Sequence, residues 1–140
     1  MDVEVEDRIL RVVPHRAPIL RIHAVVAVDA AAASVRGREP VGAGALPWSG
    51  GAIEGLAQAA AVLLAHGAPP CDGPRRGMLV GVKRFTVHGE PAAGEDVDYH
   101  VTLVRRFGPT ALVHGRAECC GVRLAEGEIT LWADAGGQPK

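Results

Sequence analysis

Residues 50–67 constrain this chain more than any other stretch, because nearly every side chain from position 52 to 65 is apolar and many are alanines. A helix that is apolar on all sides is normally buried on all sides. Alanine and glycine allow neighbouring backbone to approach such a helix closely, as when a sheet wraps around it. We therefore expect residues 52–65 to form a buried central helix that ends near His66 and Gly67.

Two polar side chains, Glu54 and Gln58, interrupt this apolar helix. They are four residues apart, so they lie on one face about one turn from each other. A carboxylate among apolar side chains is costly to desolvate and needs partners or a catalytic task. In the structural alternative, Glu54 stands in the first helical turn and complements the helix dipole. We favour a functional role for Glu54, and we expect Gln58 to orient it or to bond a backbone group of the surrounding sheet.

Composition narrows the class of protein. At 140 residues, the chain is expected to form a single domain (1–140) with a disordered tail at about 135–140. Because its net charge is −1, we expect no nucleic-acid partner. The acidic N-terminus is unlike a signal peptide, and the apolar stretch is too short to cross a membrane. Neither the three cysteines nor the six histidines have a disulfide or metal-site spacing. Cys119 and Cys120 are expected on opposite faces of a strand. We expect a cytoplasmic protein with free thiols and no metal.

Strand patterns lie on both sides of the predicted helix. Between residues 95 and 106, for example, apolar and polar side chains alternate, as in a strand with one buried face. The predicted strands are 19–28 and 34–38 before the helix, and 78–87, 95–106, 111–119 and 124–132 after it. Short connections between the later strands favour antiparallel pairing. The pattern predicts an α+β fold of the hot-dog type, with an antiparallel sheet wrapped around one central apolar helix.

Three segments carry a resemblance to a known family. Residues 13–20 read Val-Pro-His-Arg-Ala-Pro-Ile-Leu. Residues 46–48 read Leu-Pro-Trp, and residues 53–59 read Ile-Glu-Gly-Leu-Ala-Gln-Ala, with a weaker third block at 77–85 and 94–97. In order and spacing these segments resemble the hot-dog fold 3-hydroxyacyl-(acyl-carrier-protein) dehydratases, and they are most similar to the dehydratase-like branch of aryl polyene pathways. The resemblance extends over nearly the whole chain.

The resemblance implies that the protein removes water from a 3-hydroxyacyl thioester in fatty-acid or polyene-type biosynthesis. The substrate would be carried on the phosphopantetheine arm of an acyl carrier protein, and the enzyme would need no cofactor of its own. Fatty-acid dehydratases of this kind have a catalytic histidine in a Gly-His-Phe-Pro segment shortly before the helix. This chain has no histidine between His23 and His66, so that residue is absent.

The remaining residues suggest how the chemistry is divided. A carboxylic acid in an apolar site is suited to protonating a leaving hydroxyl group, and we assign that role to Glu54. Backbone N–H groups at the helix N-terminus, around Gly50 and Gly51, would stabilise the thioester oxygen as it gains negative charge. His15, in a loop restricted by two prolines, is the candidate base. We expect substrate contacts from Trp48, Ser49, Gly50, Gly51 and Gln58.

Two other functions fit the same residues. A hot-dog thioesterase would use Glu54 as a nucleophile or to activate water, and it would not need a histidine base. A non-catalytic acyl-thioester-binding subunit would use the pocket alone. We also expect a homodimer, because one sheet on one helix leaves an edge strand exposed. Three basic pairs are candidate contacts for an acyl carrier protein: Arg75-Arg76, Lys83-Arg84 and Arg105-Arg106.

Overall fold

The computed structural model describes residues 24–29, 34–40, 48–65, 77–91 and 95–133. These residues form one helix and six strands. The elements are β1 (Ala24–Asp29), β2 (Ser34–Pro40), α2 (Trp48–Ala65), β3 (Gly77–Val87), β4 (Asp96–Phe107), β5 (Thr110–Cys119) and β6 (Val122–Ala133). His15, the first half of the predicted strand at 19–28 and the tail at about 135–140 lie outside the described residues.

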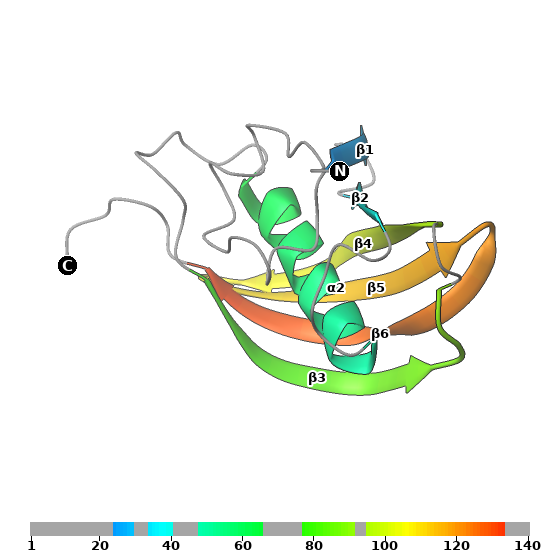
Figure 1. Ribbon diagram of the computed structural model, residues 1–140. Coiled ribbons are helices and arrows are strands. Elements are labelled where there is room, and N and C mark those ends of the chain that lie inside the picture. The colour runs from blue at the N-terminus through cyan, green and yellow to red at the C-terminus, as the bar shows by residue number, and fades with distance from the viewer. Residues whose placement is uncertain (1–23, 30–33, 41–47, 66–76, 92–94, 134–140) are drawn as a thin grey trace.

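The six strands form one sheet in the order β1-β2-β4-β5-β6-β3, and every neighbouring pair is antiparallel. The sheet is strongly curved, and α2 lies across its concave face (Figure 1). This arrangement confirms the predicted α+β architecture with an antiparallel sheet around one apolar helix. Within the described part of the chain, β3 is an edge strand whose only strand partner is β6.

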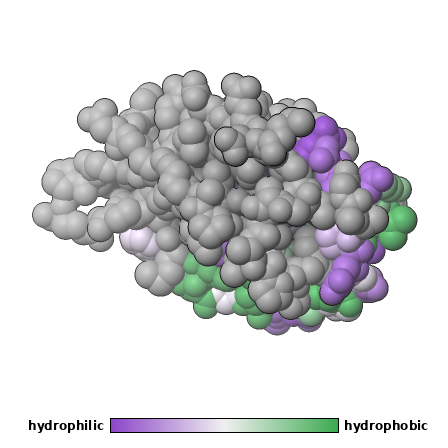
Figure 2. Space-filling view, viewed as in Figure 1, coloured by the Kyte–Doolittle hydropathy of each residue, from purple (hydrophilic) through white to green (hydrophobic). Residues whose placement is uncertain are grey.

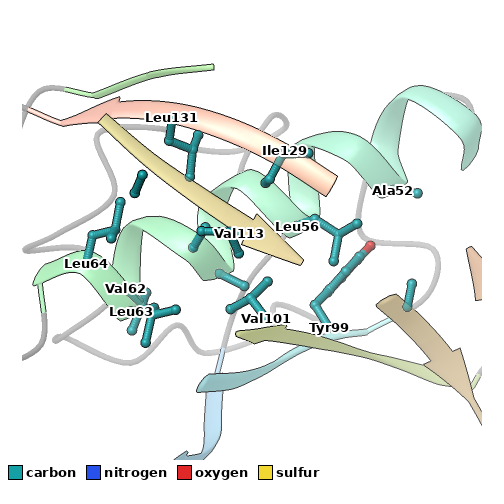
Figure 3. Close-up of a cluster of buried hydrophobic side chains, with 14 of the residues drawn as sticks. Ala52, Leu56, Val62, Leu63, Leu64, Tyr99, Val101, Val113, Ile129 and Leu131 are labelled. Atoms are coloured by element: carbon teal, nitrogen blue, oxygen red, sulfur yellow. The ribbon is translucent and has the colours of Figure 1, made fainter. Parts of the chain in front are cut away.

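The core lies between α2 and the concave face of the sheet. Inward-facing residues of β4 and β5 alternate with half-buried outward-facing ones, as the sequence pattern predicts. Figure 3 shows the aliphatic side chains of α2 packed against those of the strands. Gly115 of β5 is one point of close approach, because a Cβ atom there would lie 2.8 Å from a Leu56 methyl carbon. Gln58 of α2 is a fully buried polar side chain in this core.

Two element boundaries differ from the sequence prediction in ways that matter for the site. The helix begins at Trp48, four residues before the predicted start at position 52. Strand β5 ends at Cys119, which pairs with Val122, so Cys120 and Gly121 form a two-residue turn with φ angles of 53° and 78°. The prediction that Cys119 and Cys120 point to opposite faces of a strand is therefore wrong, and their sulfur atoms lie 4.0 Å apart.

The length and hydropathy of the described helix bear on membrane association. α2 does not combine the length and the apolar character that crossing a bilayer requires.

Candidate functional site

The centre of the candidate site is a hydrogen bond between the two polar side chains of α2. Gln58 Nε2 donates to Glu54 Oε1 over 2.9 Å. Gln58 is 1% exposed, whereas Glu54 is half-buried. The amide thus lies inside the core and holds one carboxyl oxygen, while the carboxyl group itself lies at the edge of the core. This arrangement gives the carboxyl a defined orientation at the edge of the core.

The start of α2 decides between two explanations of Glu54. Because the helix begins at Trp48, its first turn comprises residues 48–51 and contains no acidic side chain. Glu54 stands in the second turn, where a carboxylate gains little from the helix dipole, since that effect is confined to the first turn. The structural alternative of a first-turn acid is therefore wrong.

The start of α2 at Trp48 also determines which backbone N–H groups have no acceptor within the helix. The N–H groups at the start of a helix have no partner within the helix. They belong here to Trp48, Ser49, Gly50 and Gly51, so the two glycines lie inside the first turn and not ahead of it. Gly51 is buried, and the side chains of Trp48 and Ser49 lie outside the described residues. An oxyanion at this end of α2 would lie about one turn from Glu54.

Two of the six histidines are described on the strands, and both lie on the outer face of the sheet. His100 stands between the buried residues Tyr99 and Val101, so its side chain points away from α2. Its Nε2 atom lies 3.4 Å from Glu118 Oε2. His114 alternates in the same way with buried neighbours on β5. Neither side chain faces Glu54.

A third described histidine, His88, follows the end of β3. It is exposed, and its Nε2 atom lies 3.3 Å from Oε1 of Glu126. Glu126 alternates with the buried residues Ala125 and Gly127, so it too lies on the outer face. The described ranges therefore bring no histidine beside Glu54, and the candidate base His15 falls in the part of the chain that is not described.

The outer face of the sheet carries a network of ion pairs. Arg38 Nε lies 2.9 Å from Asp98 Oδ1, and Arg116 Nε lies 2.7 Å from Glu118 Oε1. The hydrogen bond from Arg116, followed by the nearby charge of His100, lowers the pKa of Glu118. These charges neutralise one another on the side of the sheet opposite α2. No group of three or more candidate ligands in the described residues is arranged to hold a metal ion.

The two described basic pairs lie on different strands of the sheet. Lys83 and Arg84 are exposed on the edge strand β3, and Arg84 has a positive φ of 55° at an irregularity in the strand. Arg105 and Arg106 are exposed at the end of β4, where the Arg105 guanidinium lies 5.3 Å from the centre of the Phe107 ring. Strands β5 and β6 separate the two pairs. The pair at positions 75 and 76 lies outside the described residues.

The edge strand β3 carries an unusual amount of exposed apolar surface. Four of its large aliphatic side chains are exposed: Leu79, Val80, Val82 and Val87. In Figure 2 hydrophobic surface lies along the lower edge of the molecule, where β3 runs in Figure 1. Exposed apolar surface of this kind is common at interaction surfaces, and on this strand it lies beside the exposed charges of Lys83 and Arg84.

Sequence reasoning missed one residue next to the site, Tyr99 of β4. Tyr99 is fully buried, and its ring lies against α2 at Gly55, the residue that follows Glu54. One signal was available in the sequence. A glycine in the interior of a helix is unfavourable by about 1 kcal/mol relative to alanine and usually has a packing reason.

Comparisons with known proteins identify the fold. No family model and no curated protein matches the sequence. The dehydratase heterocomplex ApeI:P from Xenorhabdus doucetiae is similar in structure, with a TM-score of 0.71 and 21% identity over 94% of this chain and 91% of that chain. A putative thioesterase, a phenylacetic acid degradation-related protein from Ralstonia eutropha, has a TM-score of 0.62 and 17% identity over 78% of this chain and 83% of its own.

A hypothetical thioesterase with coenzyme A from Streptococcus pneumoniae is also similar, with a TM-score of 0.60 and 10% identity over 79% of this chain and 84% of that chain. At these identities the similarity establishes the fold alone. The chain has the hot-dog fold, as the sequence predicts. Proteins of this fold similar to it include a dehydratase and thioesterases.

Proposed function

We propose that this chain is a subunit of a 3-hydroxyacyl-thioester dehydratase, which converts a carrier-protein-linked substrate to the enoyl thioester in cytoplasmic fatty-acid or polyene-type biosynthesis. The observation that carries the proposal is the Glu54 carboxyl, held by the buried Gln58 amide at 2.9 Å on an otherwise apolar helix. A dehydratase heterocomplex, ApeI:P, is among the proteins that share this fold, which is consistent with this class.

The reaction breaks one C–H bond and one C–O bond and forms a carbon–carbon double bond and water. Glu54 donates a proton to the β-hydroxyl group as the C–O bond breaks. The backbone N–H groups of residues 48–51 stabilise the negative charge on the thioester oxygen while the α-proton is removed. Gln58 keeps the Glu54 carboxyl oriented through both events.

The base that removes the α-proton is His15 in this proposal. The three described histidines lie on the outer face of the sheet or pair with a residue there, which leaves the role to a residue outside the described ranges or to a partner subunit. His15 belongs to the segment that resembles the dehydratase family. An imidazole that titrates near neutrality is a suitable acceptor for an α-proton.

The proposed assembly is a homodimer formed through β3. The exposed aliphatic side chains of this edge strand, and its second backbone edge, which no described strand pairs, fit pairing with a second β3. Antiparallel pairing centred on Val80 would place the Lys83 positions of the two copies about 20 Å apart along the strands, at 3.3 Å per residue. The basic side chains then do not repel each other across the interface.

The proposed substrate donor is an acyl carrier protein. Lys83 and Arg84 are exposed beside the proposed interface and offer positive charge to an acidic carrier protein. The phosphopantetheine arm belongs to the substrate, so the protein itself needs no cofactor.

A thioesterase is the second candidate, because two of the similar structures are described as thioesterases. In that reaction Glu54 would activate water or attack the thioester carbonyl. A non-catalytic acyl-binding subunit is the third.

Incubation with 3-hydroxyacyl and saturated acyl thioesters, on carrier protein and on coenzyme A, separates the three functions by mass spectrometry. Loss of water from the 3-hydroxyacyl substrate, absent in a folded Glu54→Gln variant, is the expected result. Release of free thiol from both substrates would instead identify a thioesterase. Tight acyl-thioester binding without either product would identify a binding subunit and overturn the proposal.

A further inference from the structure

The Tyr99 ring of β4 lies directly against Gly55, in the helix turn that carries the site. A Cβ atom built on Gly55 would lie 2.3 Å from Tyr99 Cζ and 2.7 Å from the hydroxyl oxygen. Both distances are shorter than non-bonded contacts of a Cβ atom, so any larger residue at position 55 would require α2 or the Tyr99 ring to shift. Figure 3 shows the Tyr99 hydroxyl pointing toward the end of α2 that carries Ala52.

Gly55 connects this contact to the polar pair. It directly follows Glu54, and it lies three residues before Gln58 and therefore on the same helix face. Gln58 and Tyr99 are both fully buried. The phenol ring thus packs on the same turn of α2 that sets the position of the Gln58 amide, and the amide in turn holds Glu54.

We infer that Tyr99 is the positioning residue of this site: its ring, seated against Gly55, sets the separation between the second turn of α2 and β4, and thereby the orientation of Gln58 and Glu54. The consequence for turnover rests on the proposed function. The consequence for the Gln58 side chain does not, because it concerns the geometry of the protein without substrate.

The sequence provides a direct probe of that geometry. It contains no asparagine and only two glutamines, at positions 58 and 138. The side-chain amide region of an ¹⁵N–¹H spectrum of the full chain therefore holds two pairs of glutamine signals, and a Gln58→Ala variant assigns them. The signals of Gln58 report on its hydrogen bond to Glu54 without any assay of activity.

Gly55→Ala adds one methyl group against the buried Tyr99 ring, so the ring and the turn of α2 that carries Gln58 must move apart. We expect the Gln58 signals to shift, and we expect kcat to fall about 10²-fold with KM nearly unchanged, the scale for a displacement of about 1 Å at a catalytic group. The double variant Gly55→Ala/Tyr99→Leu removes the clash. Its Gln58 signals should therefore return most of the way to their wild-type positions, and its kcat should return most of the way to the wild-type value.

Gly115→Ala is the matched control. Its added methyl group would also clash, but with the mobile end of the Leu56 side chain at 2.8 Å, which can rotate without moving the helix. This variant should lose stability while the Gln58 signals and kcat stay as in the wild type. If Gly55→Ala does not fold, Tyr99→Leu alone provides the test, because it removes the ring without adding an atom to the helix and should still shift the Gln58 signals.

Two results would overturn the inference. One is unshifted Gln58 signals in folded Gly55→Ala or Tyr99→Leu; the other is a double variant that shifts them as far as Gly55→Ala does. A wild-type protein without dehydratase activity would count against the proposed function alone, since the spectra still decide the role of Tyr99.

Discussion

The Gln58 side-chain amide, 1% exposed, donates a 2.9 Å hydrogen bond to the half-buried carboxyl group of Glu54. A buried amide is stable only when it is hydrogen-bonded, so the core of this protein is built to hold that amide in one place. The carboxyl group is thus held from the inside of the core. A carboxyl group needs a defined orientation if it is to exchange a proton with a bound substrate.

The role of Glu54 can be tested with Glu54→Gln, which keeps the shape of the side chain and removes its acid–base capacity. We expect the variant to retain the circular dichroism spectrum of the wild type, while turnover of a 3-hydroxyacyl thioester falls by about two to four orders of magnitude. Turnover is measured by mass spectrometry as loss of water. Equal turnover in a folded variant would remove Glu54 from the mechanism.

The proposed β3 interface can be tested by substituting a charged residue for one of its apolar side chains. We expect the wild type to have about twice the 14.6 kDa chain mass in light scattering at micromolar concentration. Val80→Asp should produce monomers, because a carboxylate would be buried in the interface. Val104→Asp is the matched control, since Val104 on β4 is 55% exposed against 53% for Val80 and does not lie on the edge strand. Equal masses for the two variants would contradict an interface at β3.

The ion pair between Arg116 and Glu118 predicts a pH-dependent contribution to stability. Its hydrogen bond lowers the pKa of Glu118 below the ordinary value of 4.5. A carboxyl whose pKa is lowered in the folded state stabilises the fold above its unfolded pKa, and the stabilisation disappears as the pH falls through the folded pKa. We expect Arg116→Leu to lower the free energy of unfolding by less than about 1 kcal/mol at pH 7, since both side chains are partly exposed.

The loss in free energy of unfolding caused by Arg116→Leu should become smaller as the pH is lowered from 4.5, because Glu118 becomes protonated in both proteins. Urea unfolding curves at several pH values measure the difference. Arg106→Leu, at an exposed site at the end of β4, is the control and should show no such trend. A difference between Arg116→Leu and the wild type that is constant down to strongly acidic pH would contradict the ion pair.

The thiol of Cys120 should react slowly although it is exposed. Its hydrogen bond to Glu95 Oε2 over 3.2 Å, and then its contact with Cys119, raise its pKa to about 11. Because the thiolate is the reactive form, alkylation by iodoacetamide at pH 8 should be slower than for a free cysteine and should accelerate as the pH rises toward 11. Glu95→Gln should increase the rate, as measured by peptide mass spectrometry. An unchanged rate in that variant would argue against the hydrogen bond.

Much of the fold could be predicted because its signals are local. An all-apolar helix and strands with period-2 alternation are each visible within a dozen residues. The start of the helix was predicted four residues late, because two adjacent glycines, Gly50 and Gly51, are typical of a loop and yet stand here in the first helical turn. The turn formed by Cys120 and Gly121 was not predicted, because Cys120 adopts a positive φ of 53°, which is uncommon for residues other than glycine.

The site was predictable only in part, for a physical reason. Glu54 and Gln58 are four residues apart on one helix, so their proximity follows from helix geometry alone. Tyr99 is 44 positions from Gly55, and their contact depends on how α2 crosses the sheet. No local pattern carries that information. The outward orientation of His100, in contrast, does follow from the alternation along β4.

The last prediction concerns the base, which we assign to His15. His100 provides the comparison, because it lies on the outer face of the sheet with its Nε2 atom 3.4 Å from Glu118 Oε2 and does not face α2. We expect His15→Ala to reduce kcat for a 3-hydroxyacyl thioester by about two to four orders of magnitude and to abolish the acidic limb of the pH–rate profile. His100→Ala should retain both the rate and the profile.

A second measurement separates a base from a structural residue in the same experiment. When the α-carbon of the substrate carries deuterium, a lost base should make proton removal rate-limiting, so the isotope effect on kcat should increase in His15→Ala. A structural defect would lower kcat and the folded fraction together without changing the isotope effect.

Mixing inactive His15→Ala with inactive Glu54→Gln then tests whether the two residues act across the dimer. If they do, each mixed dimer contains one intact site, so statistical mixing should restore up to about a quarter of the wild-type rate. No recovery would place His15 and Glu54 in the same subunit.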